Sequence, residues 1–380
     1  MRRGLMAWSH DEVPPALLER RMAALVAGLR ERALHCVLVY TDLTRPAAVS
    51  ALTHFIPYWS NGVLVVAPDA GATLVATMSR RVADWIHSTS RLDRLVNTLD
   101  LGQGVSDALP AAAGAALRVG VVELAGLPDG VVAVVRRRRP DVRFEEAGDL
   151  LDAALAPGGG TPQAVVQRAL AIAGSALAAG LEQAGRGDAA AVLAAAEGTA
   201  RLAGAEEVAL ALAPDMRSDP RLRRIEGTAA LGREVALQVT LAYKGCWLRL
   251  ARTAAPDGAA PPRLARTEAW FQELLANSPA DSPERLTAAI DAALPRLPGA
   301  RVESWRLEGA RAGLALATLA ASQWPSRGVA TATTPPTLSL RLRDEEGPWF
   351  GAGVIATRAG AQQAPRAGAP HAAATGVSSA

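Results

Sequence analysis

The pattern of apolar and polar positions divides the first half of the chain into alternating helix-like and strand-like segments. Between Pro15 and Arg32, apolar residues recur at the spacing of an amphipathic helix. Short apolar runs at Cys36 to Tyr40, Gly62 to Pro68 and Ala72 to Thr77 are typical of strands. Because Asp69-Ala70-Gly71 separates the last two runs, they predict a β-hairpin.

A predicted helix at Arg80 to Thr89 and a strand at Val119 to Leu124 continue the alternating α/β pattern to about Asp149. The segment from Ala156 to Pro162 contains three consecutive glycines and ends in Thr-Pro, which predicts a linker followed by a helix start. Beyond it the pattern predicts helices at Pro162 to Gln183, Asp188 to Leu202, Arg263 to Ala276 and Pro283 to Leu294. It predicts strands at Glu207 to Leu212, Glu234 to Leu241, Trp247 to Leu250, Arg301 to Leu307, Leu338 to Leu342 and Gly351 to Ala356. We therefore expect domains at 1–155 and 156–360, and a disordered Ala-, Gly- and Pro-rich tail at 361–380.

Composition and charge narrow the classes of partner. The formal net charge is only +3 over 380 residues, and the one basic run, Arg136 to Arg139, has no interleaved aromatic residues. It is interpreted as a solvated helix end, so we expect no nucleic-acid partner. Two isolated cysteines, Cys36 and Cys246, favour a reducing compartment. Since neither a signal-peptide core nor a run of about 18 apolar residues stands out, we expect a cytoplasmic protein without membrane attachment.

One stretch carries a motif with chemical meaning. Residues 238–253 read Gln-Val-Thr-Leu-Ala-Tyr-Lys-Gly-Cys-Trp-Leu-Arg-Leu-Ala-Arg-Thr. This stretch resembles the metal-binding hairpin of the pita-bread metallopeptidases, the family of aminopeptidase P, prolidase and the metal-free relative creatinase. The positions that match the family's Asp-x-Gly-x-x-Tyr-x-Gly-Tyr-x-x-Asp-x-x-Arg-Thr pattern are Tyr243, Gly245, Arg252 and Thr253. The two metal-binding aspartates of the pattern fall on Gln238 and Arg249.

The resemblance implies an α/β (α+β) chain with a creatinase-type N-terminal α/β domain followed by a pita-bread domain. The family holds two divalent metals with two Asp, one His and two Glu, because anionic ligands offset the charge of the metals. The remaining ligand positions fall on Ala310, on Leu342 or Arg343 with the apolar alternation favouring Arg343, and near Gly351. The family's other histidines fall on Arg221 and Ala317, and no histidine lies between Ser88 and Pro370. We therefore expect no metal site and no cofactor.

The residues at these positions suggest what could occupy the site instead. The candidate ligand-binding side chains are Arg221, Gln238, Thr240, Arg249, Arg311, Arg343 and His54. If several arginines point inward, they could bind a carboxylate or phosphate through bidentate hydrogen bonds. In the alternative, these arginines pair with neighbouring acids such as Glu308 or reach solvent. Cys246 is expected to be a buried structural thiol, because a nucleophilic cysteine needs a base and this region has no histidine. His54 is either an ordinary turn residue or a ligand contact.

Two hypotheses of different class follow from these positions. The first is a catalytically degenerate binding protein that recognises a small anion, a peptide or a protein partner, as a chaperone domain of this fold does within the family. The resemblance implies a homodimer, or a heteromer with an active relative. The second is a metal-independent hydrolase that cleaves a C–N bond in a small anionic amide or amidine, as creatinase does. An active dinuclear metallopeptidase is disfavoured.

Overall fold

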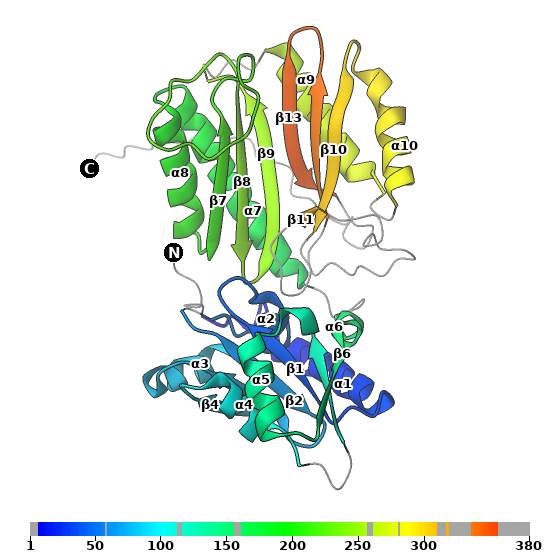
Figure 1. The fold of residues 1–380 in the computed structure, drawn as a ribbon. Helices are drawn as coiled ribbons and strands as arrows, with labels where there is room; N and C mark the ends of the chain where they lie inside the picture. The colour runs from blue at the N-terminus through cyan, green and yellow to red at the C-terminus, as the bar shows by residue number, and fades with distance from the viewer. Residues whose placement is uncertain are drawn as a thin grey trace, which may run out of the picture.

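A computed structural model describes residues 7–57, 59–111, 116–155, 161–256, 261–279, 282–309, 317–318 and 336–355. It contains a six-stranded sheet from the first half of the chain and a seven-stranded sheet from the second half (Figure 1). This mixed α/β architecture is the predicted fold class. The predicted tail and the positions Ala310 and Arg311 lie outside the described residues.

The first sheet combines a hairpin with parallel strands. Its order is β4-β3-β2-β1-β5-β6. The strands are β1 (Cys36–Thr41), β2 (Gly62–Ala67), β3 (Gly71–Ala76), β4 (Arg94–Asn97), β5 (Leu117–Val122) and β6 (Val142–Glu146). The antiparallel pair of β2 and β3 confirms the predicted hairpin, whereas β5 and β6 extend the sheet in parallel from β1. Sequence reasoning missed β4 and β6, because each is short and contains charged or amide side chains.

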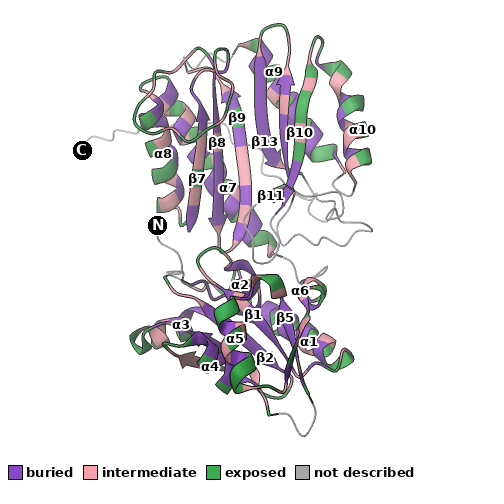
Figure 2. Cartoon of the chain, viewed as in Figure 1, coloured by how far each residue is buried: buried purple, intermediate pink, exposed green. Residues whose placement is uncertain are grey.

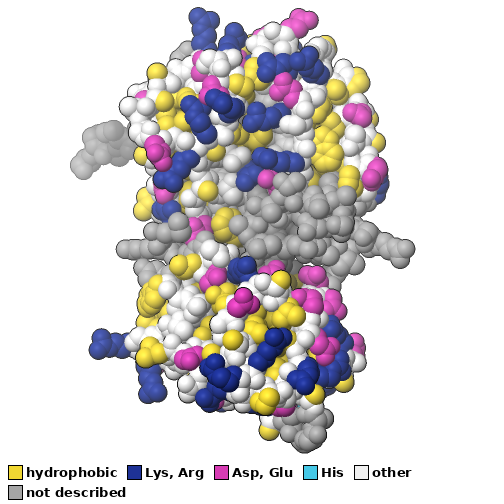
Figure 3. Space-filling model, viewed as in Figure 1, with side chains coloured by type: hydrophobic (Ala, Val, Ile, Leu, Met, Phe, Trp, Pro, Cys, Tyr) yellow, Lys and Arg dark blue, Asp and Glu magenta, His cyan; other side chains and the backbone are white. Residues whose placement is uncertain are grey.

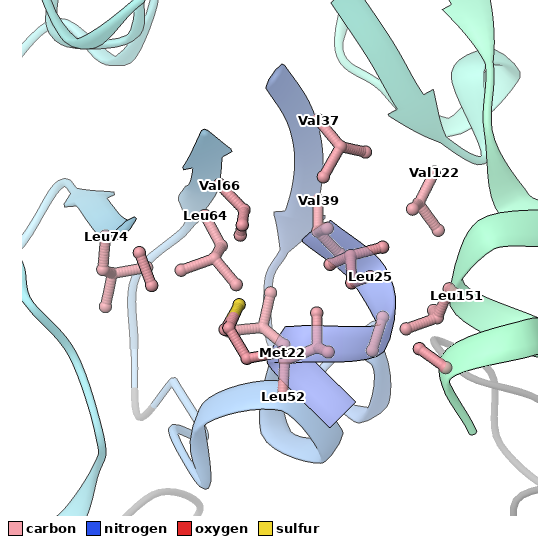
Figure 4. Close-up of a cluster of buried hydrophobic side chains, with 14 of the residues drawn as sticks. Met22, Leu25, Val37, Val39, Leu52, Leu64, Val66, Leu74, Val122 and Leu151 are labelled. Atoms are coloured by element: carbon pink, nitrogen blue, oxygen red, sulfur yellow. The ribbon is translucent and has the colours of Figure 1, made fainter. Parts of the chain in front are cut away.

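Helices cover both faces of the first sheet. They are α1 (Pro15–Glu31), α2 (Ala47–Thr53), α3 (Ala83–Thr89), α4 (Leu101–Ala108), α5 (Asp129–Arg138) and α6 (Gly148–Ala154). One core packs residues of α1, α2 and α6 against the sheet (Figure 4), and a second packs α4 and α5 on the other face. The prediction of α1 is confirmed. The helix α2 was missed because seven residues are too few to show a helical period.

The second sheet is antiparallel throughout, in the order β11-β10-β12-β13-β9-β8-β7. The strands are β7 (Glu207–Ala213), β8 (Val235–Tyr243), β9 (Cys246–Ala254), β10 (Arg301–Gly309), β11 (Ala317–Thr318), β12 (Thr337–Arg343) and β13 (Pro348–Val354). All of them except β11 were predicted from the alternation of apolar and polar residues. The longer predicted strands are correct because one face of this sheet is buried, which gives a strong two-residue period.

Four helices cover one face of the second sheet: α7 (Gln163–Ala184), α8 (Ala189–Leu202), α9 (Pro262–Asn277) and α10 (Pro283–Ala293). The helices α7 and α8 pack on β8 and β9, and α9 and α10 pack on β10, β12 and β13 (Figure 2). By length and composition alone, α7 could cross a membrane. Its buried residues, such as Ile172 and Ala176, instead belong to the core of the second sheet.

The N-terminal segment joins the two halves of the molecule. Val13 and Leu18 lie in the core of the second sheet, although the helix that contains Leu18 otherwise packs on the first. Across the same junction, the Lys244 ammonium pairs with Glu12, and the Tyr243 hydroxyl donates to Glu12 at 3.0 Å. These contacts place the β8–β9 turn against the first half of the chain.

Candidate functional site

The stretch that carries the motif forms the β8–β9 hairpin. Its two-residue turn, Lys244-Gly245, has positive φ angles of 47° and 75°. Such angles match the twist of a hairpin and favour glycine at the second position. The Glu206 carboxylate receives both turn amides, from Lys244 at 2.6 Å and from Gly245 at 3.4 Å. The turn is therefore held by its own backbone angles and by an acid at the start of the neighbouring strand.

The four residues that match the motif all make scaffold contacts. The Tyr243 hydroxyl donates to Glu12 at 3.0 Å, which links the hairpin to the N-terminal segment. Arg252 lies 3.2 Å from Glu268 of α9, on the helix side of the sheet. The Thr253 hydroxyl donates to the Phe350 carbonyl, and the Phe350 amide donates to that hydroxyl, both at 2.9 Å. These last bonds hold β9 to β13.

The face of the sheet away from the helices, here called the open face, carries the unmatched positions. In the antiparallel register, Thr240 lies opposite Arg249, and Gln238 lies opposite Ala251. Arg249 Nε donates to Thr240 Oγ1 at 2.8 Å, and its guanidinium forms an ion pair with Glu308 of β10. The Ser339 hydroxyl donates to the second Glu308 oxygen at 2.8 Å. With the Arg249 and Glu308 side chains only 14% and 5% exposed, this is a largely desolvated, hydrogen-bonded pair.

The other predicted arginines do not gather around Arg249. Arg343 pairs with Glu303 at the edge of the open face. Arg221 makes two hydrogen bonds to Asp219, at 2.7 and 3.2 Å, and its side chain is 81% exposed. Hydrogen bonds from Arg221 lower the pKa of Asp219 to about 2. Each of these arginines is therefore matched by an acid, as the alternative interpretation expected.

The structure also settles which side chains of the last two strands reach the open face. Arg343 lies on that face, whereas Leu342 packs in the core beneath the helices, as the apolar alternation predicted. Gly351 is different, because it lies on the helix side, where a Cβ atom would meet the Trp349 ring at 2.2 Å. Its neighbours Phe350 and Ala352 face outward, so Gly351 itself does not reach the open face.

An apolar layer, which sequence reasoning missed, lies on part of the open face. The segment 214–234 crosses this face and contributes Met216, which is 1% exposed. Met216 packs with residues of four strands, namely Ala213, Ala236, Ala251, Phe350 and Ala352. The only sequence signal was that alanines occupy outward positions on several of these strands, which leaves room for a covering side chain. Among the described residues, no group of three or more His, Cys, Asp or Glu side chains could hold a metal ion.

His54 and Cys246 lie near the junction of the two halves. His54 ends α2 with a left-handed φ of 65°, as expected of a turn residue. Its Nδ1 lies 2.8 Å from the Thr89 carbonyl, so Nδ1 carries the proton and Nε2 is a hydrogen-bond acceptor. Within the described part of the chain, Nε2 has no partner. Burial lowers the pKa of His54 and raises that of Cys246 to about 12, so Cys246 is a buried neutral thiol, not a nucleophile.

His54 lines a small cavity of about 40 Å³ between the two halves, together with Arg21, Ser50 and Lys244. That volume accommodates a water molecule but no substrate of peptide size. The exposed surface shows no patch of a single charge, because basic and acidic side chains are intermixed over the face seen in Figure 3. The candidate site is therefore the open face around Arg249, and not this cavity.

Comparison with known proteins supports the fold but not a function. No family model matches the sequence, and no curated protein does. The prolidase from Pyrococcus horikoshii has a TM-score of 0.62 and 13% identity, over 88% of this chain and 94% of that one. The X-Pro aminopeptidase from Thermotoga maritima has a TM-score of 0.59 and 12% identity, over 88% and 97%. The N-terminal domain of the FACT complex subunit SPT16 from chickpea has a TM-score of 0.50 and 13% identity, over 90% and 94%.

These similarities extend over both sheets and both halves of the chain. The order of elements agrees with them, since a mixed sheet precedes an antiparallel sheet whose helices lie on one face. At this level of identity the comparison establishes fold alone. The chain therefore has the pita-bread fold of prolidases and X-Pro aminopeptidases.

Proposed function

We propose that this protein acts by binding a peptide or protein partner on a prolidase-like fold, and that it is not a metal-dependent peptidase. The ion pair between Arg249 and Glu308 carries this proposal. A dinuclear metal site needs several anionic oxygens that converge on the metals. Here the hairpin offers Gln238 and Arg249, and the guanidinium is paired with Glu308, a buried carboxylate beside them.

The same pair argues against a small anion as the ligand. An anion that bound Arg249 would displace Glu308 and leave its buried carboxylate with only the more distant and more exposed Arg306, at 3.7 Å, which is unfavourable. Arg343 and Arg221 are matched by acids as well. A peptide or protein can instead use the apolar and neutral polar groups of this face. That the fold also occurs in a subunit of the FACT complex agrees with a role in an assembly.

The metal-independent hydrolase is less well supported. Its substrate would be held by Arg249, which is already paired. Its nucleophile or base would have to come from the described second half, where Cys246 is a neutral thiol and the described residues contain no histidine. We therefore retain binding as the proposed function.

A first experiment tests the absence of peptidase chemistry. Purified protein would be incubated with Mn²⁺, Co²⁺ or Zn²⁺, passed over a desalting column and analysed for metal and for hydrolysis of Xaa-Pro dipeptides. We expect no stoichiometric retention of metal and no hydrolysis. Retention of two divalent ions per chain together with Xaa-Pro hydrolysis would overturn the proposal.

A second experiment tests binding at the open face. A photo-crosslinking amino acid replaces Gln238 on the open face or, as the matched control, the exposed Gln272 on the outer side of α9. After irradiation in cells, we expect a discrete crosslinked partner from position 238 and none from position 272. Equal crosslinking from both positions, or none from 238, contradicts a partner at this face. Mass spectrometry of the product distinguishes a second copy of the chain from another protein.

A further inference from the structure

A cleft of about 420 Å³ lies at one end of the first sheet. It forms where β1 ends, β2 begins and β3 ends. The lining residues are Tyr40, Asp42, Leu43, Thr44, Trp59, Ser60, Asn61 and Thr77. Its volume falls within the range typical of sites for small molecules. This lining combines aromatic walls with one carboxylate.

Polar side chains of the lining lie near that carboxylate. The Thr77 hydroxyl donates to Asn61 Oδ1 at 2.6 Å, so the amide nitrogen of Asn61 is the end left to act as a donor. The Tyr40 hydroxyl lies near both the Asn61 and the Asp42 side chains, and burial followed by the Asp42 charge raises its pKa. Since an ionised carboxylate only accepts, Tyr40 is a donor available to Asp42. Neutral polar groups therefore surround the carboxylate in this lining.

Asp42 is held in its ionised form. Its Oδ1 accepts from the Thr44 amide and hydroxyl, both at 2.7 Å, and from the Arg45 amide at 2.9 Å. Burial by itself raises the pKa of Asp42, but these hydrogen bonds outweigh it and the pKa lies below the ordinary value. The Arg45 guanidinium donates to the Gly126 carbonyl at 2.8 Å and is not part of the lining. The residues that line the cleft therefore include one negative charge and no basic side chain.

Two large apolar side chains of the lining are unusually exposed to solvent. Trp59 is 52% exposed and Leu43 is 39% exposed, both at the mouth of the cleft. The Ser60 hydroxyl oxygen is buried and has no hydrogen-bond partner among the described residues. An indole face attracts organic cations, and an ionised carboxylate with a nearby hydroxyl can accept N–H donors. A single carboxylate does not provide the several anionic ligands that a divalent metal needs.

We propose that this cleft binds an alkylammonium group, with the cation between the Asp42 carboxylate and the Trp59 ring. The ammonium could be supplied by a free organic amine or by a lysine side chain of a peptide. The chemistry is the same in both, because each presents a protonated nitrogen at the end of an alkyl chain. This site is independent of the function proposed for the open face, since no residue is shared between them.

The test uses the full chain and measures dissociation constants by NMR, with the indole N–H signal of Trp59 as the reporter and, in the variant that lacks this indole, the side-chain amide signals of Asn61. The probes are n-butylammonium, its neutral counterpart 1-butanol, and N-acetyl-lysine amide. We expect both cations to bind at least about tenfold more tightly than 1-butanol, which is the effect of one partly screened charge pair. The ratio of the two cation constants shows which source the cleft prefers. Equal affinity for 1-butanol and n-butylammonium would overturn the proposal.

Variants locate the contact. Asp42→Asn keeps the oxygen that accepts from Thr44 but removes the charge, and we expect about tenfold weaker binding of n-butylammonium. Trp59→Leu, at an exposed side chain, should weaken binding about threefold or more. The matched control is Asp69→Asn, at a carboxylate that is 97% exposed in the β2–β3 turn, and it should bind as the parent does. Unchanged affinity in Trp59→Leu, or in a folded Asp42→Asn protein, contradicts the assignment.

Discussion

The two faces of the second sheet are stabilised in different ways. On the helix side, alternate residues of β8 such as Leu237 and Val239 are fully buried beneath α7 and α8. On the open side, the residues between them include Gln238 and Thr240, and the charges that face them are paired, as in Arg249 with Glu308. One face therefore rests on apolar burial, and the other depends on hydrogen bonds and matched charge.

This difference explains why the hairpin resembles a family while its functional positions do not. The matching residues Tyr243, Gly245, Arg252 and Thr253 contact the N-terminal segment, the turn, α9 and β13. Gln238, Arg249 and Arg343, three of the positions that the resemblance assigns to metal binding, lie on the open face, where a side chain can change without disturbing those contacts. A fold and the chemistry performed on it are thus specified by separate sets of residues.

The largest loss of stability is expected when the charge pair of the open face is broken. Glu308→Ala leaves Arg249 buried without its counter-charge, and we expect the free energy of unfolding to fall by about 3–5 kcal/mol in urea denaturation. Glu303→Ala, which breaks the more exposed pair with Arg343, is the control and should cost at most about 1 kcal/mol. Similar losses from both variants would contradict the view that desolvation distinguishes the central pair.

The double variant Arg249→Met with Glu308→Leu sharpens the same comparison. Replacing both members by apolar groups of similar size removes the unpaired charge, so most of the lost stability should return. If the double variant is as unstable as Glu308→Ala, the open face depends on this pair for more than charge compensation.

A smaller effect is expected where the motif joins two strands. Thr253→Val keeps the shape of the side chain but removes the hydroxyl that both accepts from and donates to Phe350. Because the buried Phe350 backbone groups lose their partners, we expect a loss of about 1–3 kcal/mol in urea denaturation. A change below about 0.5 kcal/mol would show that β9 and β13 are held mainly by packing.

The junction of the two halves should respond to pH through His54. Burial lowers its folded-state pKa, while the unfolded value is about 6.5. The unfolded state therefore binds the proton more readily, and stability falls as pH decreases below about 6.5 and is fully present above it. His54→Gln should remove this part of the slope in unfolding experiments between pH 5 and 7. Parallel curves for the two proteins would assign the slope to other groups, such as Glu12, whose pKa is also shifted in the folded state.

The smallest effect is expected at Arg221. Because its side chain is 81% exposed, Arg221→Ala should leave the midpoint of urea unfolding unchanged. The pKa of Asp219, which hydrogen bonds from Arg221 hold at about 2, should rise towards its ordinary value, as measured by NMR titration. An unfolding midpoint that shifted clearly would place Arg221 in contact with the open face, against the structure.

Much of the fold could be predicted because burial leaves a period in the sequence. The helix α1 and the strands β8, β10 and β12 follow from it, since each buries one face and leaves the other polar. The elements that were missed, such as α2 and β4, are too short or too polar to show a period. The same alternation placed Arg343 rather than Leu342 on the open face.

The position of the candidate site could be predicted from the sequence, but which of its charges are paired and which part of its face is covered could not. The residues of the hairpin identified Gln238 and Arg249, yet the pairing of Arg249 with Glu308 joins positions 59 residues apart. The covering of the open face by Met216 was likewise not visible in the sequence, because a loop that packs on a sheet has no fixed period. For β13 the sequence did not fix which residues face outward, since neighbours such as Phe350 and Gly351 give no polar and apolar alternation.

The sequence by itself determined the order of elements, the pita-bread hairpin and the identity of the side chains at its functional positions. Local spacing decides these properties, because the period of burial is read along the chain. Only the tertiary structure decided which charges are neutralised, which face is covered, and that Tyr40, Asp42 and Trp59 surround one cleft. Such properties depend on distances between segments far apart in sequence, and pairing or exposure of a charge is fixed by those distances.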